Sequence, residues 1–352
     1  MQGFKKRLWL INRSKKLLIR RTEKKRKCKN LRRHNGGKDV ITHDANFFSL
    51  KIAEQKSRVN FIAPKSFSIE SNGEETLEFF SNLISFVENK YENTEEKTLY
   101  IDSSQVVDVT ESTLMYLFAI VSDAKAANFD IGGNHPKKEK IRRLYKQCGF
   151  DRIMSKKSFT QQYFDDNEVF IVRGEKIPTK TVANICKFIR KETGIETRSL
   201  YEALIELMGN TTQHAYYEDD KLEKKWQIFI KNSLSKVRLI FLDTGRGIPS
   251  TVRKNWNEKL RSIFPPVLDV KESKILQSAF EGNFRTRTES PTRGKGLPQI
   301  YRTMCEEYIE SAFTYSGKGV CIIFKDCAPQ YYDRQRELYG TLYELNILRR
   351  KL

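Results

Sequence analysis

A carboxylate, an amide and an imidazole follow one another at four-residue spacing within residues 199–215. If this stretch is a helix, Glu206, Asn210 and His214 lie along one side of it, because each residue turns the chain by about 100°. The apolar residues beside them form a core-facing stripe made of Leu200, Ala203, Leu204, Leu207, Met208 and Thr211. The polar line suits a magnesium and nucleotide site. It also suits three solvated side chains, since most polar helix faces meet only water.

An aspartate follows a predicted strand, Val237–Leu242, and two glycines come soon after it. The carboxylate of Asp243 could accept a hydrogen bond from an exocyclic amine such as N6 of adenine. Gly245 and Gly247 would let the backbone approach a base and adopt positive φ. The alternative is a tight surface turn, because a motif this short is common.

A second glycine-rich segment opens a predicted helix that carries Ile300, Met304 and Tyr308. The segment consists of Arg293, Gly294, Lys295, Gly296 and Leu297. Backbone N–H groups and the helix dipole at such a start favour phosphate binding, and the lysine adds a positive charge. The segment is not a P-loop, because no Gly-Lys-Ser/Thr follows an upstream glycine, and it does not lie in a first βαβ turn as a dinucleotide fingerprint would.

The elements that must position these groups are predicted from apolar spacing. A helix at Lys180–Thr193 precedes the helix at 199–215, and the strands Trp226–Ile230 and Val237–Leu242 form a hairpin at Asn232-Ser233. Further strands are expected at Val169–Val172 and Leu342–Ile347. Upstream, strands alternate with helices, which indicates an α/β fold with helices packed on a sheet. The expected elements there are strands at Val59–Ile62, Thr98–Ile101 and Phe129–Ile131, and helices at Thr76–Val87, around Leu114–Val121 and around Ile141–Leu144.

Three motifs, ELMGNTTQHA, DTGRGIP and RGKGLPQI, occur in the order and at the spacing found in the GHKL ATPase superfamily, which includes DNA gyrase, sensor histidine kinases and MutL proteins. The resemblance covers residues 180–349. It implies a domain at about 165–350 with the Bergerat fold, an α/β sandwich that has helices on one face of a mixed sheet. It also implies ATP and Mg²⁺ as ligands.

The resemblance implies a role for each matched residue. Asn210 would bind the magnesium ion that bridges the ATP phosphates, and Asp243 would bind adenine N6. The base pocket would be shaped by Gly245 and Gly247, with Thr341 near adenine after Gly340. The phosphates would be wrapped by Arg293, Gly294, Lys295, Gly296 and Leu297. Residues 250–293 would form a lid whose Arg285 and Arg287 either reach the γ-phosphate or stay solvated. Pro298 departs from the family, which has a glycine there.

Glu206 stands four residues before the magnesium-binding amide. In relatives that hydrolyse ATP, the Glu at this position activates water, and in kinases it activates an acceptor group. The resemblance therefore implies ATPase or Ser/Thr protein kinase activity, unless Glu206 only tunes the magnesium shell. A conventional histidine kinase is not expected, because no histidine lies on a predicted dimerisation helix.

Residues 57–155 resemble the STAS fold of anti-sigma-factor antagonists, from LYIDSSQVVDVTEST through DIGG to QCGF. Regulatory members carry a serine or threonine at a helix N-terminus that a partner kinase phosphorylates. That position falls on Thr110. An acid beside it, Glu111, would repel a phosphate, so helix N-capping by Thr110 is the alternative.

The charge of the chain is concentrated at its start. Of the net charge of +20, residues 1–38 carry +15, with 16 Lys and Arg against the single acid Glu23. Residues 1–45 are expected to be a flexible basic arm. The arm could contact nucleic-acid phosphates, dock on an anionic membrane through Trp9 and its leucines, or have no specific ligand.

A length of 352 residues allows two domains with a core in each. The six cysteines form no CxxC pair, which indicates reduced, mostly buried thiols. No apolar run is long enough to cross a membrane, so a cytoplasmic location is expected.

Three classes of function stay open. The first is an ATP-dependent signalling switch, anti-sigma-factor-like, with ATPase or Ser/Thr kinase activity and a regulatory protein partner. The second is a nucleic-acid-associated stress or defence effector whose arm is gated by ATP. The third is a scaffold that binds ATP without turnover. A homodimer is compatible with each.

Overall fold

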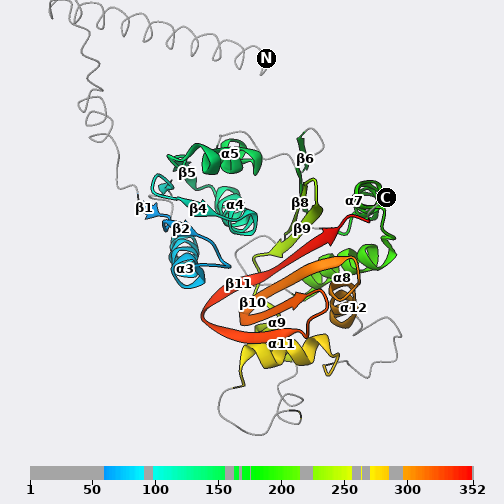
Figure 1. Ribbon diagram of the computed structural model, residues 1–352. Coiled ribbons are helices and arrows are strands. Elements are labelled where there is room, and N and C mark those ends of the chain that lie inside the picture. The colour runs from blue at the N-terminus through cyan, green and yellow to red at the C-terminus, as the bar shows by residue number, and fades with distance from the viewer. Residues whose placement is uncertain are drawn as a thin grey trace, which may run out of the picture. The chain divides into compact units, whose positions relative to one another are not determined.

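The computed structural model describes residues 59–90, 98–154, 162–165, 169–174, 176–214, 225–255, 263, 270–284 and 296–350. The basic arm lies outside them. Residues 57–352 cluster into one compact unit (Figure 1). Among the helices of these ranges, none is long and apolar enough to cross a membrane.

The N-terminal part is a parallel sheet with helices, as the alternating pattern predicts. Within the described residues its strands lie in the order β1 (Val59–Ile62), β3 (Thr98–Asp102) and β5 (Asp130–Gly133), and both pairings are parallel. A short parallel pair is formed by β2 (Ser66–Phe67) and β4 (Asp108–Val109). The helices are α3 (Gly73–Lys90), α4 (Glu111–Ala126), α5 (Glu139–Gln147) and α6 (Phe150–Met154).

The C-terminal part is an antiparallel sheet packed against helices. In the described ranges its strand order is β10-β11-β9-β8-β7-β6. The strands are β6 (Gln162–Asp165), β7 (Val169–Gly174), β8 (Trp226–Asn232), β9 (Lys236–Asp243), β10 (Ile309–Phe324) and β11 (Gln330–Leu348). The expectation of a mixed sheet is wrong here, because each of these strands pairs antiparallel with its neighbours. The hairpin predicted between β8 and β9 is confirmed, with Asn232 opposite Val237.

The helices of the C-terminal part are α7 (Thr179–Thr193), α8 (Arg198–His214), α9 (Ile248–Asn255), α11 (Glu272–Phe280) and α12 (Gly296–Met304). The first two agree with the predicted ranges to within two residues. The helix predicted to carry Tyr308 is shorter than expected, because it ends at Met304 and β10 begins at Ile309. The last strand is longer than predicted and runs beside β10 (Figure 1).

Alternate residues of the sheet face two different cores, as the two-residue period of a strand requires. Phe241 of β9 and Tyr343 of β11 belong to a cluster with α7, α8 and α12, where Leu204 and Ile300 are also buried. The intervening Leu242 and Leu342 belong to a second cluster together with α3 and α4. The sheet therefore has helices of the C-terminal part on one face and the N-terminal part on the other.

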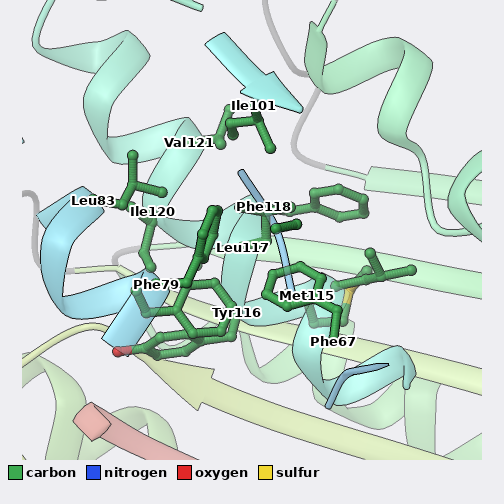
Figure 2. Packing of buried hydrophobic residues seen from close by; sticks show 14 of the residues in the cluster. Phe67, Phe79, Leu83, Ile101, Met115, Tyr116, Leu117, Phe118, Ile120 and Val121 are labelled. Carbon is green, nitrogen blue, oxygen red and sulfur yellow. The ribbon is translucent and has the colours of Figure 1, made fainter. Parts of the chain in front are cut away.

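Helix α4 is buried along almost its whole length. Its hydrophobic side chains pack against Phe67, Phe79 and Leu83 of the N-terminal part (Figure 2), and the Tyr116 ring lies 4.8 Å from that of Phe80. The same cluster includes residues of β8, β9 and β11. A helix that is buried on nearly all sides is a core helix, so α4 is shared between the two parts of the chain.

Candidate functional site

The carboxylate and the amide predicted for magnesium and catalysis lie one turn apart on α8, and both are half-buried. Desolvation by burial raises the pKa of Glu206 above its ordinary value. Nδ2 of Asn210 is buried and has no hydrogen-bond partner among the described residues. A buried amide without a partner is costly unless a ligand satisfies it. Of the third member of the line, His214, the structure describes only the backbone, at the end of α8.

The start of α12 meets these two residues. A side-chain carbon at Gly296 would lie 2.6 Å from Oε2 of Glu206 and 3.6 Å from Oδ1 of Asn210. Because Gly296 has no side chain, the first residue of α12 can lie this close to Glu206. The structure thus brings together residues from two motifs that are about 90 residues apart in the sequence. Arg293, Gly294 and Lys295 lie outside the described residues, as do Arg285 and Arg287.

Asp243 is buried at the end of β9, opposite Thr341 in the antiparallel ladder. Burial raises the pKa of its carboxyl from 3.8 to about 7, against the lowering effect of hydrogen bonds from the backbone N–H groups of Gly245 and Thr341. The Gly245 N–H donates to Oδ1 over 2.9 Å. By the alternation of β9, this side chain is on the same face of the sheet as Phe241, the face covered by α8 and α12.

Two glycines with positive φ lie beside this aspartate, Gly247 in the turn that follows it and Gly340 in the facing strand β11. Gly247 has φ +76°, and a side-chain carbon there would lie 2.8 Å from the Ser316 hydroxyl oxygen and 2.9 Å from the Gly340 carbonyl oxygen. Gly340 has φ +87°, and a side-chain carbon there would collide with the Asp243 carbonyl oxygen. The sequence predicts positive φ at Gly245 and Gly247; it is present at Gly247, but the prediction for Gly245 is wrong. Gly247 and Gly340 let two backbone segments come into contact.

Ser316 is part of this arrangement, although no sequence motif indicates it. Its hydroxyl group lies 3.0 Å from the Thr341 hydroxyl and accepts a hydrogen bond from the Ile248 N–H over 2.8 Å. The serine lies within the long strand β10, where one hydroxyl residue among many forms no motif. It connects the first residue of α9 to β11.

An apolar contact links the two halves of the site. Leu297, the second residue of α12, packs together with Ile248 against Val252, Ile275 and other residues of a small cluster. Ile248 directly follows the glycine turn, and Leu297 directly follows Gly296. The Glu206–Asn210–Gly296 group and the Asp243 turn are therefore neighbours across this small cluster.

The predicted lid range is described in part, as α9 and α11. The start of α11 is held to β11, because the N–H groups of Glu272 and Ser273 donate to the Asp333 carboxylate over 3.2 and 2.6 Å. Glu272 in turn accepts a hydrogen bond from the Lys318 N–H over 2.6 Å and pairs with Arg253 over 2.5 Å. Helix α11 is thus held to β10 and β11, and α9 is joined to α11 through Arg253.

Thr110 is the N-cap of α4, and it is half-buried. Its hydroxyl oxygen accepts from the Thr113 N–H over 3.4 Å, and its O–H donates to Oε2 of Glu70 over 2.7 Å. The capping role is confirmed. Phosphorylation of Thr110 stays a prediction, and a phosphate there would meet the Glu70 carboxylate as well as Glu111.

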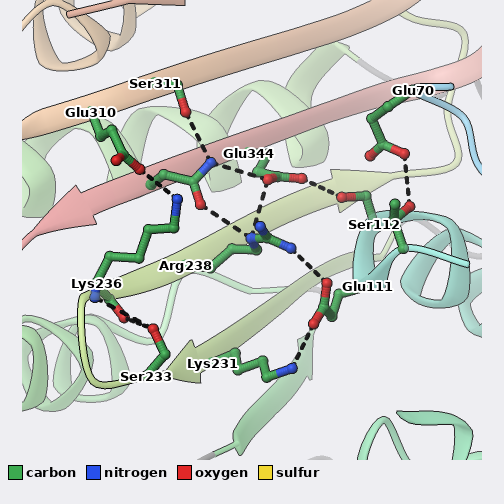
Figure 3. Close-up of polar contacts among 12 residues, drawn as sticks. Glu70, Glu111, Ser112, Lys231, Ser233, Lys236, Arg238, Glu310, Ser311 and Glu344 are labelled. Carbon is green, nitrogen blue, oxygen red and sulfur yellow. Dashed lines mark hydrogen bonds and ion pairs between the residues drawn. The ribbon is translucent and has the colours of Figure 1, made fainter. Parts of the chain in front are cut away.

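The N-terminus of α4 is joined by charged pairs to the face of the antiparallel sheet that the N-terminal part covers (Figure 3). Glu111 binds Lys231 over 2.6 Å and Arg238 over 2.5 Å. Burial raises the pKa of the Glu111 carboxyl, but the attraction of the two cations outweighs it, so the pKa lies below its ordinary value. Ser112 donates a hydrogen bond to Glu344, which also contacts Arg238. Thr110 therefore lies on the opposite face of the sheet from Asp243.

A surface hollow elsewhere in the C-terminal part contains none of the predicted residues. It is lined by residues of both charges, among them Arg198, Glu202, Arg302, Glu306 and Arg349. Among the described residues, no cluster of three or more His, Cys, Asp or Glu side chains is arranged to hold a metal ion. The cysteines in the described ranges are free thiols, and Cys148, Cys186 and Cys321 are buried.

Comparisons with protein-family models, with curated proteins and with solved structures found no match for this chain.

Proposed function

We propose that this chain is an ATP- and magnesium-binding regulatory protein of the GHKL type, whose nucleotide site lies between α8, α12 and the Asp243 turn. The single observation that carries the proposal is the contact of Gly296 with both Glu206 and Asn210. A helix that begins at a glycine lies beside a half-buried carboxylate and beside an amide whose Nδ2 has no partner among the described residues, and these groups together suit phosphates and a cation.

The residues present fit the ligands. Oδ1 of Asn210 is an oxygen ligand of the kind that magnesium prefers, and Nδ2 is free to donate among the described residues. The N-terminus of α12 supplies backbone N–H groups for phosphate oxygens. When bound, Mg²⁺-ATP would supply the phosphoryl group, and the protein would contribute position, charge and a base.

Adenine recognition is assigned to the Asp243 turn. A buried carboxylate with no cation beside it among its recorded interactions suits a neutral amine donor such as N6 of adenine. The left-handed turn at Gly247 keeps side chains away from the base. The Thr341 hydroxyl, held by Ser316, lies at the facing strand and would complete the pocket.

Glu206 is the proposed base. Its burial raises its pKa, which brings a carboxylate closer to the range where it can take a proton from a water molecule or hydroxyl group at neutral pH. Helix α8 fixes it one turn before Asn210, so base and cation ligand keep a constant separation.

ATP hydrolysis is favoured over transfer to the chain's own Thr110. The candidate acceptor is on the opposite face of the sheet from Asp243, and its hydroxyl group is engaged by Glu70. A kinase activity would therefore act on a separate partner protein. The alternative of an effector with a nucleic-acid-binding arm rests on residues 1–38, which lie outside the described residues.

Incubation with ATP labelled on the γ-phosphate, with Mg²⁺, tests the proposal. Release of labelled phosphate indicates an ATPase, label on a partner indicates a kinase, and binding without turnover indicates a scaffold. Failure to bind ATP at millimolar concentration would refute the proposal. Nucleotide binding that is unchanged in the Asn210→Ala variant and in the absence of Mg²⁺ would refute the assigned metal site.

A further inference from the structure

Helix α4 presents one stripe of residues to the antiparallel sheet. Ser112, Tyr116 and Asp123 recur at spacings of four and seven, which places them on the same side of the helix. Each of the three makes a hydrogen bond to a residue of the C-terminal part. Two of these contacts lead to residues that flank Asp243, namely Thr244 and Tyr339.

The first contact involves the turn after Asp243. The Asp123 carboxylate is 3% exposed, and its two oxygens have different partners. Oδ1 forms an ion pair with the buried Arg173 of β7, and Oδ2 accepts a hydrogen bond from the Thr244 hydroxyl over 2.8 Å. A buried carboxylate needs all its partners, because each lost hydrogen bond leaves charge without compensation. Thr244, which directly follows Asp243, is thereby held in place from α4.

The second contact involves the facing strand. The Tyr116 hydroxyl donates to the Tyr339 carbonyl oxygen over 2.6 Å. The next residues are Gly340, which touches the Asp243 backbone, and Thr341, which pairs with Asp243 in the ladder. Helix α4 therefore contacts both backbone segments next to Asp243, the turn at Thr244 and the strand β11 at Tyr339. It does so from one face of the sheet, whereas the Asp243 side chain lies on the other face.

We propose that α4 positions the base pocket, and that Asp123 is the positioning residue, acting through the Thr244 hydroxyl on the Asp243 turn. The inference rests on the proposed function, because it assigns the Asp243 turn to adenine. Its consequence is reciprocal: a partner or modification that shifts α4 changes ATP affinity, and bound ATP changes the packing of α4 by the same free energy.

The test compares three variants of the full chain in the binding of Mg²⁺-ATP, measured by calorimetry. Thr244→Val keeps the shape of the side chain but removes the hydrogen bond to Asp123, whereas Thr244→Ser keeps the hydroxyl group. Ser112→Ala is the matched control. It removes a buried hydrogen bond from the same face of α4 to the carboxylate of Glu344, which is not next to the Asp243 turn. Thermal midpoints of all variants show whether the fold is retained.

Thr244→Val is expected to weaken ATP binding by about tenfold, the usual effect of one hydrogen bond to a charged group. Thr244→Ser and Ser112→Ala are expected to bind within about twofold of the wild type. In the free protein, amide hydrogen exchange of residues 245–247 is expected to be faster in Thr244→Val and unchanged in Ser112→Ala. This readout does not depend on the nucleotide.

Two results overturn the inference while leaving the proposed function intact. One is a wild-type chain that binds ATP and a Thr244→Val variant that binds it with the same affinity. The other is an equal loss in Ser112→Ala, which would show a general effect of loosening α4. A wild-type chain that does not bind ATP would refute the proposed function and the inference together. In that case, amide hydrogen exchange at residues 245–247 that is the same in Thr244→Val and in the wild type would also show that the Asp123–Thr244 hydrogen bond does not hold the Asp243 turn.

Discussion

Gly296 lies against Glu206, so that a side-chain carbon on the glycine would come within 2.6 Å of Oε2 of the carboxylate. The contact joins the first residue of α12 to the middle of α8. The φ of Gly296 is not in the left-handed region, so the constraint at this position is space. A side chain there would have to displace the carboxylate of Glu206, the candidate base.

Gly296→Ala is expected to weaken Mg²⁺-ATP binding by about tenfold, because the new methyl group must displace the Glu206 carboxylate or the start of α12. Overpacking of this kind costs about 1–3 kcal/mol, and a tenfold change corresponds to about 1.4 kcal/mol. Calorimetric binding measures the effect.

The control for Gly296→Ala is the same substitution in a Glu206→Ala background, where the obstructing carboxylate is gone. The loss caused by Gly296→Ala should be much smaller there, because residues in contact do not act additively. Equal losses in both backgrounds would contradict the contact.

Glu206→Gln is expected to lower the rate of ATP hydrolysis by at least about 100-fold, because an amide cannot accept the proton that a carboxylate base takes. The amide is nearly isosteric, so ATP affinity should change little. Phosphate release and binding are measured on the same preparation.

Glu202→Gln is the matched control for that loss. Glu202 lies one turn earlier on α8, is exposed, and pairs with Arg198 over 3.2 Å. Its removal should leave hydrolysis within about twofold of the wild type, since exposed pairs contribute little. Hydrolysis by Glu206→Gln at the wild-type rate would disprove the base assignment.

Local patterns were sufficient to predict most elements. The helices at 179–193 and 198–214 and the β8–β9 hairpin follow from apolar spacing and from turn residues, which are properties of neighbouring positions. Thr341 pairs with Asp243 in the ladder, and Gly247 has the positive φ expected of it, whereas the adenine-binding roles of these residues stay predictions.

Long-range packing could not be predicted in the same way. The apolar residues of α4 indicate a helix, but not that it is covered on both sides, because β8, β9 and β11 come at least 100 residues later. The antiparallel order of the sheet depends on how β10 and β11 pair. Arg173, Asp123 and Ser316 belong to no motif, and only the fold brings them to the Asp243 turn or to α4.

Gly340→Ala is expected to lower the free energy of unfolding by more than about 2 kcal/mol. The position has φ +87° and faces the Asp243 backbone, so an alanine there suffers both strain, of about 1–3 kcal/mol, and a collision that no side-chain movement relieves. Urea unfolding measures the change.

Gly209→Ala provides the opposite control on α8. Among the described residues, an added carbon there would meet only Cδ1 of Ile177, at 4.0 Å. Alanine inside a helix is favoured over glycine by about 0.5–1 kcal/mol, so this variant should be slightly more stable than the wild type. If both substitutions changed stability equally, the argument from backbone contact at Gly340 would fail.

Asp243→Asn is expected to change the pH dependence of stability. In the folded chain the pKa of the Asp243 carboxyl is raised to about 7 from 3.8. Between these values the unfolded chain loses its proton while the folded chain keeps it, so wild-type stability falls as pH rises through this window and levels off above about pH 7.

Asparagine does not ionise, so the variant lacks this loss. The stability of Asp243→Asn relative to the wild type should therefore increase by about 3 kcal/mol between pH 5 and pH 8. About two pH units of this range lie below the folded pKa, and each contributes about 1.4 kcal/mol. Urea unfolding at several pH values measures the free energy of unfolding of both chains. Because they share every other titrating group, the difference between them isolates the Asp243 contribution. Stability curves that stay parallel from pH 5 to pH 8 would show that Asp243 is ionised throughout, and hence that its carboxylate is better solvated than its burial implies.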